Sequence, residues 1–83
     1  MKQVTVRFGA REVGALGLAY KRKETVNATS DHDALMQLYE HYEHFSNVVG
    51  FYYGPEEDTE NPMCQWKEVS LSKISNTLYT EEN

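Results

Sequence analysis

The chain contains little cysteine and no long apolar run, and each absence excludes a class of protein. Cys64 is the single cysteine, which excludes an internal disulfide framework and a cysteine-rich zinc module and indicates a reducing compartment. No segment approaches the roughly 18 consecutive apolar residues that a membrane-spanning helix needs. Residues 1–7 lack the apolar stretch of a secretory signal peptide. We therefore expect a cytoplasmic protein without membrane contact.

The residues that are present are sufficient for one small folded domain. A length of 83 residues predicts a single domain over 1–83. Apolar residues make up 40% of the sequence and aromatic residues 12%, a composition typical of a folded chain and not of a disordered one. A domain of this size has a thin core, which leaves little material to shape a deep active-site cleft.

Charge is distributed unevenly along the chain. The net charge is −5, but residues 1–29 carry six basic and two acidic side chains, whereas residues 30–83 carry two basic and eleven acidic ones. The acidic balance argues against direct nucleic-acid binding, because contacts to phosphates supply most of that affinity. It favours a partner with a basic surface, and it also serves solubility.

The apolar pattern predicts four strands and one helix. Residues 2–10 alternate in polarity, as a half-buried strand does, and residues 16–27 form a second strand whose alternation decays midway. We interpret Gly9, Gly14 and Gly17 as turn residues. Further strands are expected at 48–53 and 63–69, paired as a hairpin with a long connection. A short C-terminal helix is indicated by the spacing of Leu71, Ile74 and Leu78.

The helix is expected to begin after Thr29 or Ser30 and to run to about residue 45. Either residue can accept a hydrogen bond as N-cap, and Asp31 and Asp33 suit the positive end of the helix dipole. One arc of this helix is apolar and consists of Ala34, Leu35, Leu38, Tyr39, Tyr42 and Phe45. The predicted fold is therefore α+β, in ββαββ order: an antiparallel sheet of about four strands with the amphipathic helix on one face. The helix should cover residues of strands 2–10, 16–27 and 48–53, Leu18 among them.

Three patterns that could carry chemistry fall short of a catalytic or metal site. His41 and His44, at helical spacing with Glu40 nearby, resemble part of a metal site, but no second cluster completes four ligands. Cys64 has no identifiable base to activate it as a nucleophile. The glycine spacing matches no phosphate-binding loop. We predict no catalytic residue, no metal and no cofactor, and hence a protein that is not an enzyme.

The acidic segment after the third strand is the candidate binding site. Glu56, Glu57, Asp58 and Glu60 do not match a calcium loop, which needs a central glycine and a terminal bidentate acid. A solvated loop accounts for them, but so does a series of carboxylates that mimics phosphates and occupies a basic groove on a partner. Tyr53, next to this segment, is the expected aromatic anchor of such an interface.

The order of elements resembles that of many small bacteriophage-encoded proteins. Over residues 2–53, two strands lead through Thr29 and Ser30 into a capped helix, and a strand follows. Several inhibitors of bacterial defence, including anti-CRISPR proteins, are similar in size, charge and element order. The resemblance implies an inhibitor that acts through its surface on a host protein in the bacterial cytoplasm. It carries over no functional residue.

Two other functions remain open. A homo-oligomeric structural or regulatory module, such as a homodimer, could assemble through an exposed strand edge of the sheet. Contact of the basic stretch 21–23 with nucleic acid is a third reading, and an absent or salt-independent gel shift would dispose of it.

Overall fold

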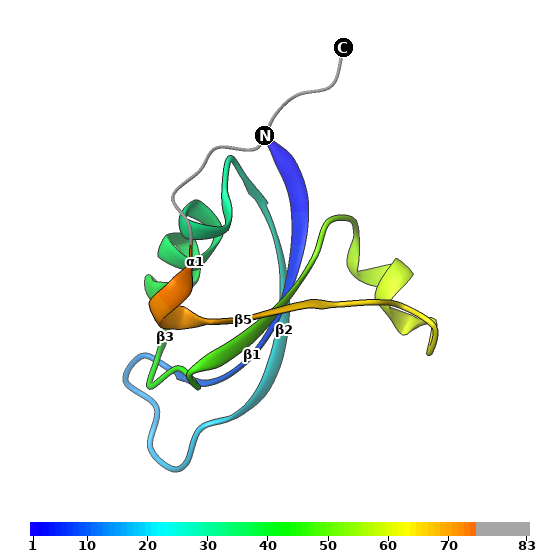
Figure 1. The fold of residues 1–83 in the computed structure, drawn as a ribbon. Coiled ribbons are helices and arrows are strands. Elements are labelled where there is room, and N and C mark those ends of the chain that lie inside the picture. Colours follow the sequence, from blue (N-terminus) through cyan, green and yellow to red (C-terminus); the bar gives the residue numbers. More distant parts are fainter. Residues whose placement is uncertain (75–83) are drawn as a thin grey trace.

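A computed structural model describes residues 1–74 and has the expected α+β architecture. One antiparallel sheet has the strand order β2-β1-β4-β5, and β3 pairs with β1 off this path. The strands are β1 (Lys2–Glu12), β2 (Tyr20–Ala28), β3 (Tyr42–Glu43), β4 (Val48–Tyr52) and β5 (Lys67–Ser70). Helix α1 (Asp31–Tyr39) lies on one side of the sheet, and the 3-10 helix η1 (Glu56–Glu60) lies on the other (Figure 1).

The core lies between α1 and the sheet. Alternate residues of β1 face it, as the polarity pattern predicts, because successive side chains of a strand point to opposite faces. The buried apolar residues are Val4, Val6, Phe8, Ala10, Ala28, Ala34, Leu35, Leu38, Tyr42, Val49 and Phe51. Phe8 is the aromatic centre of this cluster: its ring stacks on Phe45 and meets Tyr42 edge-on, with both centroids at 5.1 Å.

Helix α1 begins where the sequence predicts. Ser30 is the N-cap, and its side-chain oxygen accepts a hydrogen bond from the Asp33 backbone N–H at 3.0 Å. The Asp33 carboxylate in turn accepts from the Thr29 backbone N–H at 2.9 Å. These two bonds satisfy backbone donors at the helix start, an arrangement worth about 1 kcal/mol to a helix.

The predicted end of the helix, at about residue 45, is wrong, because α1 stops at Tyr39. Tyr42 and Glu43 instead form β3 against the end of β1. His44 takes a left-handed backbone conformation, with φ of 60°. The apolar arc continues past Tyr39 in sequence, but burying Tyr42 beside Phe8 in strand geometry outweighs the local helical period. His41 and His44 are therefore not neighbours on a helix face.

The second strand starts later than predicted, at Tyr20 in place of residue 16. Leu18, expected in the core, is 89% exposed. Gly14 and Gly17 have positive φ angles of 85° and 108°, so these two are turn residues, as expected. Gly9 is not: it lies within β1 and pairs with Lys21. The apolar character of residues 13–19 reflects an exposed loop and not a buried strand.

The C-terminal half follows the predicted hairpin. β4 pairs with β5 from Val48↔Ser70 to Phe51↔Lys67, across a long connection that contains η1 where a loop was expected. β5 starts at Lys67, four residues later than predicted. Leu71–Lys73 form the short 3-10 helix η2, and Ile74, predicted to continue a helix, has extended backbone. The remainder of the predicted C-terminal helix, with Leu78, lies outside the described residues.

Tyr42 links this core to β2 through a hydrogen bond that raises its pKa. Its hydroxyl donates to Glu24 at 2.6 Å. This bond, together with burial, raises the pKa of Tyr42 from 10.0 to about 12. As pH rises, the unfolded chain therefore loses this proton first. The contribution of the protonated Tyr42 hydroxyl to the free energy of unfolding is complete below pH 10 and is lost between pH 10 and about 12.

We expect Tyr42→Phe to flatten the alkaline dependence of stability. Between about pH 9 and 11 the native protein should lose about 1 kcal/mol more unfolding free energy than the variant. Urea unfolding at several pH values measures this difference. Tyr39→Phe is the control, since the Tyr39 ring contacts Phe45 and leaves the Tyr42–Glu24 bond in place. Equal pH slopes for the native protein and Tyr42→Phe would contradict this account.

Candidate functional site

The acidic 3-10 helix η1 is fixed to the face of the sheet opposite α1. The Thr59 hydroxyl donates to the Glu56 carbonyl at 2.6 Å and accepts from the Lys23 ammonium of β2 at 3.0 Å. The Thr5 hydroxyl of β1 donates to the Gly54 carbonyl at 2.9 Å, just before η1. The turn is therefore held by two strands that precede it by more than 30 residues in sequence.

The four predicted acidic residues lie together on this turn, and all are exposed. Asp58 accepts a hydrogen bond from the Tyr52 hydroxyl at 3.0 Å. Glu60 lies 4.0 Å from the Lys23 ammonium, with a side chain that is 72% exposed. Glu56 and Glu57 form no ion pair within residues 1–74. The turn thus presents four carboxylates to solvent, and three of them, Glu56, Glu57 and Asp58, form no ion pair among the described residues.

A shallow open hollow adjoins the acidic turn. It is lined by Tyr52, Glu57, Asp58, Asn61, Met63 and Cys64. The hydrogen bond to Asp58 raises the pKa of Tyr52 above its ordinary value, so this phenol stays neutral at physiological pH. Carboxylates beside a neutral phenol and a thioether suit the cationic head and aliphatic stem of a lysine or arginine. The hollow has the chemistry to receive one basic side chain of a partner.

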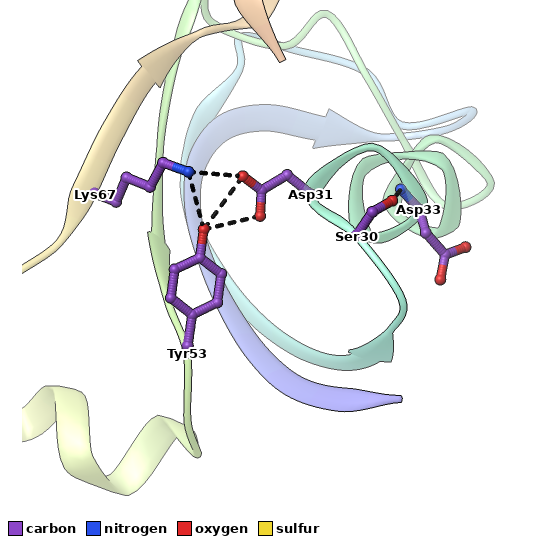
Figure 2. Close-up of polar contacts among 5 residues, drawn as sticks. All are labelled: Ser30, Asp31, Asp33, Tyr53 and Lys67. Carbon is purple, nitrogen blue, oxygen red and sulfur yellow. Dashed lines mark hydrogen bonds and ion pairs between the residues drawn. The ribbon is translucent and has the colours of Figure 1, made fainter. Parts of the chain in front are cut away.

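Tyr53, predicted to join the acidic residues, is oriented differently. Its hydroxyl donates to the two carboxylate oxygens of Asp31 at 3.0 and 3.2 Å (Figure 2). Tyr53 as a whole is 44% exposed. Tyr53 therefore has its polar end directed to the start of α1 and leaves part of the residue accessible, while the preceding Tyr52 is the tyrosine that contacts the acidic turn.

Asp31, Tyr53 and Lys67 form a polar cluster, and the pattern of the sequence does not reveal it. The Lys67 ammonium lies 3.3 Å from both the Asp31 carboxylate and the Tyr53 hydroxyl, as Figure 2 shows. Asp31 is buried, at 6% exposure. A buried carboxylate needs such partners, because an unpaired one would shed its charge or destabilise the fold. The cluster joins the start of α1 to β4 and β5.

The two pKa shifts in this cluster favour a structural role over proton transfer. Burial, with the Asp31 charge, raises the pKa of Tyr53. The hydrogen bond to Tyr53 raises the pKa of Lys67. Both groups therefore keep their protons at neutral pH, whereas a general base must be able to lose one near the working pH.

The residues weighed for metal binding or catalysis are not brought together. His44 Nε2 accepts from the Arg11 guanidinium at 3.0 Å, and the His41 carbonyl accepts from the Val13 N–H at 2.9 Å. Cys64 lines the acidic hollow, away from both. Within residues 1–74, no three histidine, cysteine, aspartate or glutamate side chains are grouped so that they could hold a metal ion.

Comparison with known proteins adds no family to this geometry: no family model, curated protein or solved structure matches the chain. Among the described residues no helix has the length and apolar character needed to cross a membrane. The assignment of a function therefore depends on the surface itself.

Removal of the Tyr53 hydroxyl should destabilise the protein. Tyr53→Phe leaves Asp31 without one hydrogen-bond donor, and we expect a loss of about 1 kcal/mol in unfolding free energy. The adjacent Tyr52→Phe is the matched control and should leave stability nearly unchanged, since its hydroxyl bond is exposed. Urea unfolding of both variants at pH 7 makes the comparison. Equal losses would show that the cluster does not stabilise α1 against the sheet.

Proposed function

We propose that this chain is a small acidic inhibitor that binds a protein through its surface and blocks a basic site on it. The observation that carries the proposal is the acidic turn, whose four carboxylates face solvent on a 3-10 helix held by side-chain bonds. The partner is expected to be a host protein that handles nucleic acid or acts in defence.

Charge and rigidity support this proposal in different ways. Carboxylates placed along a turn can pair with the lysines and arginines that a nucleic-acid enzyme uses to hold phosphates, which makes the two ligands competitors. The bonds from Lys23 and Tyr52 attach the turn to β2 and β4, and we propose that they restrict its conformations before binding. A preordered surface loses less conformational entropy on association, which favours tight binding for a small contact area.

The hollow next to the turn adds a specific contact to this general attraction. One arginine or lysine of the partner would place its charge beside Glu57 and Asp58 and its stem along Met63. Tyr53 points to Asp31 on the other face of the sheet, so the aromatic contact at this hollow is Tyr52, which lines it. In keeping with the resemblance to phage inhibitors, we place the protein in the cytoplasm of a bacterial host.

A homo-oligomeric structural or regulatory module is the second candidate. The observation that favours it is the position of β2 at an edge of the sheet, where no described strand pairs with its outer side. A strand edge can add another strand by backbone hydrogen bonds. The basic side chains of residues 21–23 on this edge oppose indiscriminate pairing.

Affinity capture from bacterial lysate tests the inhibitor proposal. The tagged protein should retain one stoichiometric partner at low salt and release it at high salt, because exposed ion pairs are screened. Replacing two unpaired acids, Glu56→Lys and Glu57→Lys together, should weaken binding to the purified partner at least about tenfold, the effect of losing two or more charge pairs at an interface.

The control changes the net charge equally at another place. Glu12→Lys with Glu40→Lys is the matched pair, since both glutamates are exposed and line a hollow that is separate from the acidic turn. It should leave affinity within about twofold, a change expected from screened long-range charge alone. Equal weakening by both pairs would assign the effect to net charge and remove the acidic turn from the mechanism. Recovery of the bait alone would count against the inhibitor.

A further inference from the structure

The connection between β1 and β2 is an exposed apolar loop. Residues 13–19 contain no charged or polar side chain. Leu16 is 98% exposed, and Leu18, expected in the core, is almost as accessible. Figure 1 shows this connection extending beyond the body of the sheet (light blue). Two highly exposed leucines within seven residues form a small apolar protrusion, the kind of feature that marks a contact site.

Two adjoining shallow hollows lie at the base of this loop. One is lined by Gly9, Ala19, Tyr20, Lys21, His44 and Ser46. The other shares Gly9, Lys21 and Ser46 and extends to the ion pair of Arg7 and Glu68. Their lining is mostly apolar surface. Gly9 contributes no side chain, so β1 leaves open space here between β2 and Ser46.

The protrusion and the hollows belong to the same end of the molecule. Ala19 and Tyr20 end the apolar loop and also line the hollow. The Arg11 guanidinium donates to the Gly17 carbonyl at 3.0 Å and to His44 at 3.0 Å. These bonds draw the loop toward His44, which is itself part of the hollow lining. An apolar protrusion therefore stands directly beside an apolar recess.

We infer that this end of the molecule is a two-fold interface with a second copy of the chain, in which Leu16 and Leu18 of each copy occupy the hollow at Gly9 of the other. A two-fold interface requires one surface that is complementary to itself. A protrusion next to a matching recess meets that requirement, because the rotation that seats one loop also seats the other. The inference is independent of the acidic turn and its partner.

Charge complementarity at the rim favours a second copy over a lipid surface. Lys21 lines both hollows and forms no ion pair among the described residues. Glu12 flanks the apolar loop; it pairs with Arg22 of its own chain at 3.4 Å, and its side chain is still 59% exposed to a second cation. When the loop of each copy lies in the hollow of the other, Glu12 of one copy comes near Lys21 of the other. An anionic membrane offers Glu12 no cation and would instead repel it.

Sedimentation equilibrium tests this inference at protein concentrations from about 1 µM to 1 mM, which detects weak and moderate dissociation constants. The native protein should dimerise within that range. Leu16→Ser with Leu18→Ser should raise the dimer dissociation constant at least about tenfold, since two leucines lose their burial. Gly9→Val should have the same effect by filling the recess. Its added Cβ meets only Ser46, at 3.4 Å, so the strand can accept it.

Met36→Ser is the matched control, because Met36 of α1 is a 48% exposed apolar residue that lies outside the loop, its two hollows and the acidic turn. It should dimerise like the native protein. Circular dichroism of each variant establishes that the fold is retained. A native protein that is monomeric throughout would overturn the inference, and so would dimers that persist in both the leucine and the Gly9 variants. Flotation of the monomer with phosphatidylglycerol vesicles, abolished by the leucine changes, would assign the loop to lipid and reject the second copy.

Discussion

β1 is hydrogen-bonded along both of its edges, and this pairing positions every other element. On one side nine consecutive residues of β1 pair with β2, from Lys2↔Ala28 to Ala10↔Tyr20. On the other side β4 pairs at its middle and β3 at its end. Because the side chains of β1 alternate, this register sends its apolar residues to α1 and its polar residues to the face that carries η1. Core and acidic turn therefore occupy opposite sides of one strand.

Local chemistry accounts for the parts of the fold that the sequence predicts well. The alternation of residues 2–10 and the Ser30 cap are signals that act within a few residues, and both are confirmed. The errors arise where distant contacts compete with a local pattern. The arc from Ala34 to Phe45 satisfies a helical period, yet Tyr42 gains more by packing on Phe8 and donating to Glu24. Leu18 has the composition of a core residue, but the turn at Gly14 and Gly17 holds it outside.

The acidic residues of the candidate site could be predicted from the sequence, but their contacts with the rest of the structure could not. Four acids within five residues identify the turn. Its attachment to the sheet comes from hydrogen bonds of Lys23 and Thr5, which lie far away in sequence, so no local pattern predicts them. Of two adjacent tyrosines, Tyr52 contacts the turn and Tyr53 contacts Asp31. A strand sends neighbouring side chains to opposite faces, so the choice between them depended on the register of β4, which the sequence alone leaves open.

The buried Asp31 carboxylate also has a consequence for the order of folding. The β1–β2 hairpin and α1 are built from contacts close in sequence, which form early because little chain entropy is lost in closing them. Lys67, 36 residues from Asp31, reaches it only when β5 docks on β4. Until then the carboxylate must stay hydrated, which keeps the start of α1 open to water. We expect amide exchange at the first turn of α1 to follow the detachment of β5, so that these two segments, far apart in sequence, open as one cooperative unit.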